Sequence, residues 1–382
     1  MNHQDMNDIN KFILLKQIAT QGPVSRIELT KRTDLSKMTV TAIVNEFISK
    51  GVVRECGASY STGGRRPILL EIVPNSMLTL GISIGRDILQ AGIINLRGEI
   101  LQSETLPMAP IRNSEALLKS IFNLCDHLIK NKLSGNILGI GVSSVGPLSV
   151  GTILNPPDFN NLHNIPVTSE LNKRYGLPVF MQNDMYVAAL AEVYFGDMQD
   201  LNSFIYIGIS SGIGGGIILN RKLYTGISGL AGTIGHSIVV PGGIQCECGR
   251  RGCLEKYSST RATLHWAKEN GAGDNITWWD LADGAVNGNP LYMQAIDRMT
   301  QYLVTAIINF QAAFDIECFV IGGDLYMCKD MIVESIRSKL RSQRTIWDQQ
   351  NEITIRPSSF ASSAPFIGTA ALVMENRLEP MP

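Results

Sequence analysis

The beginning of the chain has apolar residues at helical spacing. A first run of apolar positions stops at Gln21-Gly22-Pro23, where glycine and proline end a helix. Ser25 and Glu28 have the spacing of a capping box, which predicts a short second helix that ends near Thr33. Ser36 is a second N-cap candidate and predicts a third helix. Three helices with a tight connection between the last two predict a helix-turn-helix. The apolar positions of the first helix are Ile9, Phe12, Ile13, Leu15 and Ile18.

The third expected helix separates an apolar side from a polar side. Its inward positions are Val40, Ile43, Val44, Phe47 and Ile48. Its N-cap and outer positions are small or hydrogen-bonding residues suited to base edges and phosphates in a major groove. These residues are Ser36, Lys37, Thr39, Thr41 and Asn45. A solvated helix face that binds nothing is the alternative interpretation of the same pattern.

A glycine-rich basic tip follows between two expected strands. The first strand follows Gly51, the tip contains Gly63-Gly64-Arg65-Arg66, and the second strand covers Ile68 to Ile72. Two strands around such a tip are typical of a wing, and Arg65 and Arg66 could enter a minor groove or hold phosphate. The sequence therefore predicts a winged helix-turn-helix DNA-binding domain over residues 1–74.

After Pro74 the pattern becomes one of strands with interleaved helices. Short strands separated by three residues predict hairpins, and later strands alternate with helices, which favours an α/β protein in two lobes. The expected strands are 78–84, 88–95, 99–106, 137–142, 178–181, 204–209, 215–219 and 318–321, and the expected helices are 114–131, 187–193 and 291–314.

Length and charge narrow the class of protein. The chain has 382 residues, more than one hydrophobic core usually holds, and it is 45% hydrophobic and 18% charged. Its 33 Lys+Arg and 34 Asp+Glu give a net charge of -1, which excludes a wholly basic nucleic-acid coat. Residues 1–74 carry 10 basic and 7 acidic residues, so this segment is at +3 and the remainder is at -4. Because the N-terminus is polar and no run of eighteen apolar residues occurs, we expect a cytoplasmic protein without a membrane partner.

Three of the seven cysteines are close together in the sequence. Cys246, Cys248 and Cys253 lie within eight residues, and His236 precedes them by ten. Thiolates favour tetrahedral zinc, and a set of three cysteines with one histidine fills all four positions and leaves none for water. We expect a structural zinc ion on these four residues; the alternative is three cysteines that are buried by chance.

The same region resembles a known family. The run Ala231-Gly-Thr-Ile-Gly-His236, then Cys-x-Cys-Gly-x-x-Gly-Cys-x-Glu255, preceded by Asn183-Asp184 and a Gly-Ile-Gly-Gly-Gly turn, resembles the ROK family of repressors and sugar kinases. With the winged helix, the resemblance covers nearly the whole chain. It implies a two-lobed actin-like ATPase (ribonuclease H-like) fold, with a small lobe of residues 77–185 plus 364–382 and a large lobe of 186–363.

The positions that hold nucleotide phosphates in the family's kinases differ in this chain. The kinases have Asp-x-Gly-Gly-Thr after the first strand, and here the residues are Ser83-Ile-Gly-Arg86-Asp87. A carboxylate aimed at phosphate repels it. A second phosphate turn also differs, with Ser210-Ser211-Gly212 in place of Gly-Thr-Gly. These departures resemble the repressor branch, so we expect no enzyme activity and no catalytic residues.

The resemblance also implies an effector site. In the family, residues that match Asn183, Asp184, His236 and Glu255 hydrogen-bond sugar hydroxyls. The family's usual glutamate three residues before the histidine is Thr233 here, which removes one acceptor. We interpret the chain as a sugar-responsive repressor that binds an inverted-repeat operator as a homodimer or a tetramer. The alternatives are a sugar kinase with an added DNA-binding arm and a regulator that senses a protein partner instead of a sugar.

Overall fold

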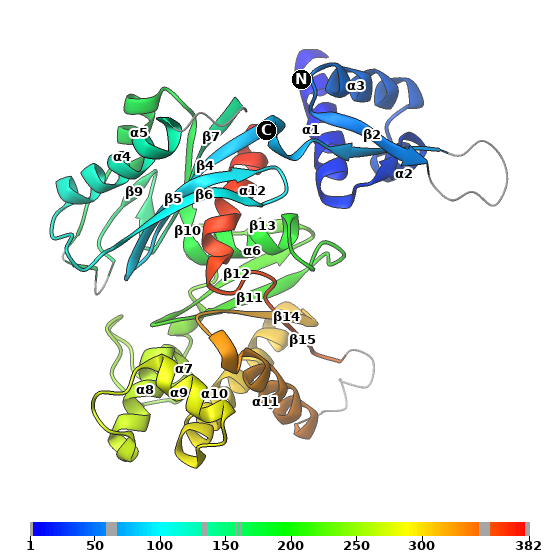
Figure 1. Cartoon of the computed structure of the whole chain (residues 1–382). Helices are drawn as coiled ribbons and strands as arrows, with labels where there is room; N and C mark the ends of the chain where they lie inside the picture. The colour runs from blue at the N-terminus through cyan, green and yellow to red at the C-terminus, as the bar shows by residue number, and fades with distance from the viewer. Residues whose placement is uncertain are drawn as a thin grey trace. The chain divides into compact units, whose positions relative to one another are not determined.

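The computed structural model describes residues 3–58, 67–130, 136–156, 159–160, 162–343 and 352–378. The chain forms two compact units (Figure 1), residues 1–195 with 366–382, and residues 196–365. The first unit contains both the N-terminal segment and the first α/β lobe. The division into three domains, with limits at residues 74, 185 and 363, therefore stays a prediction.

The N-terminal segment contains the three helices that the sequence predicts. They are α1 (His3–Gln21), α2 (Arg26–Thr33) and α3 (Lys37–Ser49), followed by a sheet in the order β1-β3-β2, made of β1 (Val24–Ser25), β2 (Val53–Ala58) and β3 (Ile68–Ile72). The capping box is confirmed, because the Ser25 hydroxyl accepts from the Glu28 amide while the Glu28 carboxylate accepts from the Ser25 amide. Ser36 caps α3 by accepting from the Thr39 amide at 3.1 Å. The expected inner face of α3 is buried at Val40, Ile43, Val44 and Phe47.

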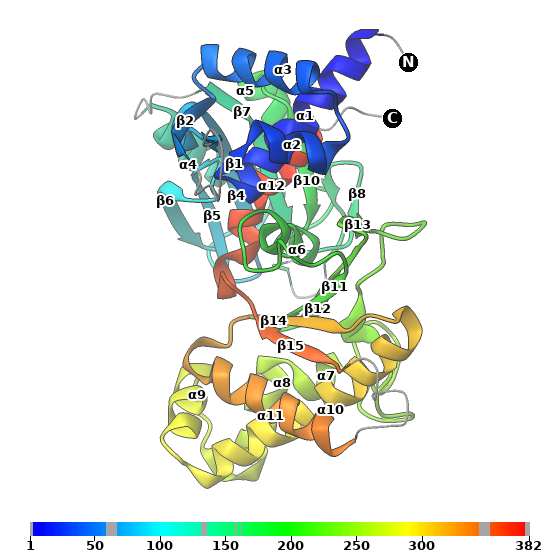
Figure 2. The ribbon, with the colours of Figure 1, turned by 90° about the vertical axis from the view of Figure 1, so that its right-hand side faces the viewer.

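The first unit contains a five-stranded sheet in the order β10-β7-β4-β5-β6. Helices α4 and α5 pack on one face of it, and α6 and α12 lie on the other (Figures 1 and 2). The strands are β4 (Met77–Ile84), β5 (Ile88–Asn95), β6 (Ile100–Pro107), β7 (Asn136–Ser144) and β10 (Val179–Asn183), and the helices are α4 (Ser114–Lys130), α5 (Val167–Tyr175), α6 (Asp184–Tyr194) and α12 (Ala364–Leu378). Short elements are η1 (Pro74–Ser76), β8 (Leu148–Ser149), β9 (Thr152–Ile153) and η6 (Ala361–Ser363), the last of which belongs to the second unit.

The second unit contains a sheet in the order β13-β12-β11-β14-β15. Helices α7 to α11 gather on one face of this sheet (Figure 2) and share one apolar core with it. The strands are β11 (Phe204–Ile209), β12 (Ile213–Leu219), β13 (Lys222–Tyr224), β14 (Cys318–Gly323) and β15 (Thr354–Pro357). The helical elements are η2 (Ile234–His236), α7 (Glu255–Ser258), α8 (Thr260–Ala267), the π-helical η3 (Lys268–Ala272), α9 (Trp278–Val286), α10 (Pro290–Phe314), η4 (Tyr326–Cys328) and α11 (Lys329–Ser342).

The two large sheets have the same topology. In each, three consecutive strands form an antiparallel meander, a fourth strand is parallel to the first, and a fifth is parallel to the fourth. This repetition is a duplicated α/β unit, which agrees with the expected two-lobed α/β class. Among the described residues, no helix combines the length and apolar character needed to cross a lipid bilayer.

Helix α12 returns the end of the chain to the first sheet at a point where two strands have glycine. A Cβ on Gly141 would lie 2.2 Å from the Thr369 carbonyl oxygen, and a Cβ on Gly81 would lie 2.3 Å from the Thr369 hydroxyl. Both glycines therefore let the helix backbone approach the sheet more closely than any side chain would allow.

Helix α6 begins earlier than the sequence predicts. We expect a helix over 187–193, whereas the observed helix starts at Asp184. The reason is local, because the Asn183 side chain accepts from the Met185 amide at 3.0 Å and so provides the N-cap. Asp184 is therefore the first helical residue and not part of a loop.

Candidate metal, effector and nucleic-acid sites

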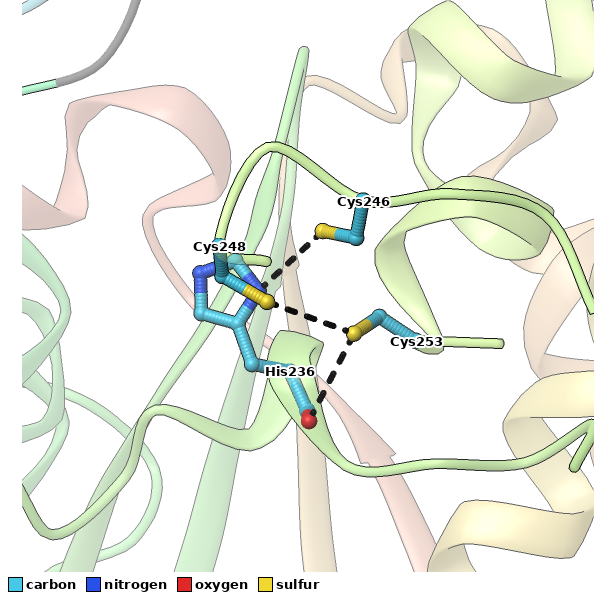
Figure 3. A group of neighbouring side chains, drawn as sticks. All are labelled: His236, Cys246, Cys248 and Cys253. Carbon is cyan, nitrogen blue, oxygen red and sulfur yellow. Dashed lines mark hydrogen bonds between the residues drawn. The ribbon is translucent and has the colours of Figure 1, made fainter. Parts of the chain in front are cut away.

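Four side chains in the second unit form a compact group of metal-binding donors (Figure 3). The donor atoms of His236, Cys246, Cys248 and Cys253 all lie within 4.8 Å of one another. Cys248 Sγ is 3.6 Å from Cys253 Sγ, and Cys246 Sγ is 3.7 Å from His236 Nδ1. The structure thus brings together the four ligands that the sequence predicts.

Tight local turns place these donors. The Cys246 amide donates to the Arg250 carbonyl at 2.9 Å, and the Gly249 amide returns to the Cys246 carbonyl at 3.0 Å. Gly252 has φ +84, and a Cβ there would lie 1.7 Å from the Val240 carbonyl oxygen. Only glycine permits this path, so the loop can fold back and bring Cys253 beside the other sulfurs.

The spacing of the donors fits a tetrahedral metal ion. With metal–sulfur and metal–nitrogen bonds of about 2.0–2.3 Å, the edges of the tetrahedron measure roughly 3.4–3.8 Å. The separations of 3.6 and 3.7 Å match this value, whereas a disulfide would need about 2.05 Å. Burial raises the pKa of the Cys246 thiol and raises that of Cys253 to about 12. A bound cation reverses this tendency, because metal ligation requires thiolates.

Glu255 follows the last cysteine and contacts a glycine turn of the same unit. Its carboxylate accepts from the Ile213 amide at 2.9 Å, and a Cβ on Gly212 would lie 2.6 Å from the same oxygen. The turn itself is closed by the Ser210 amide, which donates to the Gly212 carbonyl at 2.8 Å. The sequence predicts that Glu255 hydrogen-bonds a sugar hydroxyl. It does not predict the contact of Glu255 with the Ile213 amide, because no local pattern in the sequence indicates that contact.

Asn183 and Asp184 lie at the junction of β10 and α6 in the first unit. The Met185 amide donates to Asn183 Oδ1 at 3.0 Å and to Asp184 Oδ1 at 2.9 Å. Asn183 is therefore the N-cap of α6. This capping role alone would account for an asparagine at this position, even if it bound no sugar. A Cβ on Gly146 would lie 3.3 Å from Asn183 Nδ2, so the neighbouring loop passes close to the amide group.

The Asp184 carboxyl has an unusual protonation equilibrium. Burial raises its pKa to about 6, while the Met185 amide and the positive charge of Arg86 act in the opposite direction. Register explains the influence of Arg86. Ile84 and Asn183 both pair with Ser144, so β4, β7 and β10 end at one level and the turn after β4 shares a sheet edge with the start of α6. A carboxyl group that titrates near neutrality is typical of a functional site.

The four expected effector residues come from both units. Asn183 and Asp184 belong to the first, and His236 and Glu255 belong to the second. His236 has its Nδ1 next to Cys246, which leaves Nε2 as the ring nitrogen directed away from that sulfur. Thr233, the position where we expect the family's glutamate, is exposed and donates its hydroxyl to the Leu230 carbonyl at 3.1 Å.

The turn after β4, which we expect to correspond to the kinase phosphate loop, is a short hairpin. The Gly85 amide donates to the Ile88 carbonyl at 3.0 Å, which closes the turn over Arg86 and Asp87. Ser83 lies within β4, opposite Gln90 on one side and Ser143 on the other. Asp87 is exposed, and its carbonyl accepts from the Met108 amide at 2.8 Å.

Helix α3 presents a mixed polar and apolar stripe to solvent. Lys37, Thr41 and Asn45 are exposed as expected, and Met38 is 84% exposed although sequence reasoning left it out. Thr39 is half-buried, and its hydroxyl lies 2.9 Å from the Ser36 hydroxyl. Ser36 and Thr39 are thus engaged in capping, so the outer stripe differs from the expected one.

Two exposed basic residues stand next to this helix. Lys31 and Arg32 occupy the last turn of α2, immediately before the connection to α3. The helix-turn-helix pattern could have predicted that Lys31 and Arg32 lie beside the DNA-reading helix, because the end of the second helix adjoins the start of the third. Arg65 and Arg66, the expected tip of the wing, lie outside the described residues.

The duplicated sheets and the group of His236 with three cysteines define an actin-like, kinase-type α/β protein with a candidate metal centre. The family model described as ROK family matches residues 79–376, so this chain belongs to the ROK family.

Similar proteins include both repressors and kinases. The xylose repressor of Caldicellulosiruptor bescii is 30% identical and is aligned over 99% of this chain and 98% of its own length. A solved ROK family transcriptional regulator, described as a homologue of the Escherichia coli MLC protein, is 27% identical with a TM-score of 0.82 and covers 98% of both chains. A ROK family glucokinase from Streptomyces griseus, solved with glucose and AMPPNP, is 26% identical with a TM-score of 0.68 and covers 77% of this chain and 98% of its own.

Proposed function

We propose that this protein is a sugar-responsive transcriptional repressor whose N-terminal segment is a winged helix-turn-helix. One observation carries the proposal. The regulator covers 98% of this chain, whereas the glucokinase covers 77% although almost all of its own chain is matched. The family model begins at residue 79, after α3, a helix that is capped at its start and exposes a polar stripe, as a DNA-reading helix requires. A repressor of chromosomal genes acts in the cytoplasm.

The operator is an inverted repeat bound by a homodimer. A winged helix with a charge of only +3 binds weakly, so two segments on one dimer are needed to raise affinity through effective concentration. Lys37, Thr41 and Asn45 reach base edges or phosphates, and Arg65 and Arg66 contact the backbone or minor groove. DNA selected from random duplexes by the wild-type chain provides the operator. Replacing both wing arginines by alanine should flatten the salt dependence of binding, and an unchanged slope rejects the wing assignment.

The effector is a sugar held by Asn183, Asp184, His236 and Glu255. Asn183 Nδ2 donates, the two carboxylates accept from hydroxyls, and His236 Nε2 serves either role. Titration calorimetry with D-xylose, glucose and a panel of other pentoses and hexoses tests this set. Binding should be lost in Asp184→Ala and kept in Glu115→Ala, a control on the exposed first turn of α4. Equal binding by both variants shows that the site is elsewhere.

The metal is a structural zinc ion on His236, Cys246, Cys248 and Cys253. The four donors fill its coordination sphere, so it supplies no catalytic water. Instead it fixes the loop that leads to Glu255 and orients the His236 ring. Protein purified without chelator should contain about one zinc ion per chain. Cys248→Ser should lose it, and Cys56→Ser, which removes an exposed cysteine outside the group, should keep it.

The protein does not phosphorylate sugars. Arg86 and Asp87 occupy the turn where the family's kinases bind phosphate, and Ser83 replaces the aspartate. The raised pKa of Asp184 suits a general base, and it favours the kinase as the second candidate. A coupled assay of ADP release with the same sugar panel separates the two. Ser83→Asp alone should also be inactive, and turnover by the unmodified chain supports the kinase.

A further inference from the structure

Helix α6 is a single buried element with different surroundings at its two ends. Its first turn carries Asp184, and all nine residues from Tyr186 to Tyr194 are buried. A helix packed on all sides moves as one piece, because closely packed interiors do not deform continuously. A displacement at the first turn is therefore passed to the last.

The last turn of α6 contacts the N-terminal segment directly. The Lys16 ammonium group lies 4.8 Å from the centre of the Tyr194 ring, within the range of a cation–π interaction. Lys16 belongs to α1, which is anchored in the core of the segment by the fully buried Leu14 and Ile18. Tyr194 is itself buried, so the ring has a fixed position beneath the ammonium group.

A second contact runs through the turn between β5 and β6. A Cβ on Gly98 would lie 2.6 Å from the Phe195 ring, so the turn rests directly on the residue that ends α6. Arg97, the preceding residue, pairs with Glu71 of β3 at 3.1 Å. Glu71 also pairs with Arg54 of β2 at 2.7 Å, which ties this contact to the sheet of the N-terminal segment.

We propose that α6 couples the expected effector residues at its first turn to the DNA-binding segment through two contacts near its other end. These are the Lys16–Tyr194 contact and the Arg97–Glu71 ion pair on the turn that touches Phe195. This inference rests on the proposed function and names its regulation. A sugar hydroxyl bound to Asp184 competes with the Met185 amide for the carboxylate and so changes the hydrogen bonds of the first turn of α6. The helix then shifts along or across its axis, and this shift alters both contacts. The DNA-reading helix of each subunit is then displaced relative to its half-site.

The size of the two contacts agrees with this role. A single exposed cation–π interaction or ion pair changes an equilibrium by about 2- to 5-fold. The two together change it by roughly 4- to 25-fold, which overlaps the typical 5- to 150-fold range of coupling between two sites. Weak contacts of this kind can be broken and re-formed without unfolding either part.

The first test measures coupling in a chain that carries both Lys16→Met and Arg97→Met. Operator affinity is determined with and without saturating D-xylose or glucose, and the ratio is the coupling factor. We expect the ratio to fall to within about twofold of one, while sugar affinity without DNA and operator affinity without sugar stay within about threefold of wild type. The control carries Lys11→Met and Arg112→Met, which remove one lysine and one arginine charge elsewhere in the first unit; Lys11 pairs with Glu46 at 2.9 Å, and Arg112 is exposed. It should keep the wild-type ratio, and an unchanged ratio in the first chain overturns the proposal.

The second test needs neither sugar nor operator. Asn183→Ala removes the cap of α6, and amide hydrogen exchange is followed in α1. We expect exchange in residues 9–21 to rise at least about threefold, and the rise to disappear when Lys16→Met and Arg97→Met are added. Unchanged exchange in Asn183→Ala alone overturns the coupling by α6. If neither sugar affects operator binding by the wild type, the effector assignment fails, whereas this test still decides the role of α6.

Discussion

Replacing Asp184 by asparagine should stabilise the protein at neutral pH. The ordinary pKa of an aspartate is 3.8, and burial raises that of Asp184 to about 6, so the folded state holds a charge that its surroundings disfavour. Asparagine is neutral at every pH and keeps a side-chain oxygen for the Met185 amide, which now lies 2.9 Å from Asp184 Oδ1. The charged carboxylate therefore lowers the stability of the fold, which agrees with the proposed role of Asp184 in binding.

The magnitude follows from the two pKa values. Between pH 3.8 and 6 the folded state binds more protons than the unfolded state, so the stability of the wild type falls as the pH rises through this window. The difference between about 6 and 3.8 corresponds to about 3 kcal/mol at pH 8 and to roughly half of that at pH 5. Asp184→Asn should recover these amounts. Sugar binding to the wild type should weaken below about pH 6, because the protonated carboxyl accepts hydroxyl protons less well.

The assay must report on the first unit. All four tryptophans, at positions 266, 278, 279 and 347, lie in residues 196–365, so their fluorescence follows the second unit. Urea unfolding followed by circular dichroism, together with amide exchange in α6 and α12, reports on the unit that contains Asp184. The reasoning is refuted if Asp184→Asn has no larger free energy of unfolding than the wild type at pH 8, or if the increase is equal at pH 5 and pH 8.

A second aspartate of the same unit provides a control of opposite sign. Hydrogen bonds from Arg174 and then from Tyr175 lower the pKa of Asp126. Its charged form stabilises the fold above the ordinary pKa, and this contribution is lost as the pH falls through the lowered value. Asp126→Asn should therefore destabilise the protein at pH 8, where Asp184→Asn stabilises it.

Three further predictions concern the metal, the DNA and the fold. Cys253→Ser should abolish metal binding and lower the unfolding temperature seen by tryptophan fluorescence; full metal content in this variant contradicts the ligand set. Lys37→Ala should reduce by about one the slope of the logarithm of the DNA-binding constant against the logarithm of the salt concentration. Asn45→Ala should change the base preference in a selection of DNA sequences, and a preference identical to that of the wild type argues against base contact by Asn45. Gly141→Ala should destabilise the first unit by about 1–3 kcal/mol in urea, because the added Cβ would meet the Thr369 carbonyl at 2.2 Å; an unaffected midpoint shows that α12 can move away.

The sequence by itself determined the capped helices of the N-terminal segment and the set of candidate metal donors. Capping patterns at Ser25 and Ser36 located α2 and α3, because a cap is satisfied within three residues and needs no tertiary contact. The donor set was readable for a similar reason, since Cys246, Cys248 and Cys253 are joined by a short loop with glycine at its tightest point.

Tertiary structure decided which residues face one another over long separations. Tyr194 lies just beyond the expected helix 187–193, and only packing placed its ring under Lys16, 178 positions earlier. The Ile213 amide reaches Glu255, 42 residues away. The sequence also did not predict six of the described α-helices, which are α5, α7, α8, α9, α11 and α12.

The chemistry of the expected effector residues depended on the fold in the same way. The motif named Asp184, but its pKa of about 6 results from burial, from the Met185 amide and from Arg86 on the turn after β4. That neighbour is set by the common end of three parallel strands, a matter of register that no short segment encodes. Sequence therefore supplied the donor and acceptor groups, and tertiary structure set their solvation and their partners, because desolvation depends on every chain segment that surrounds a side chain.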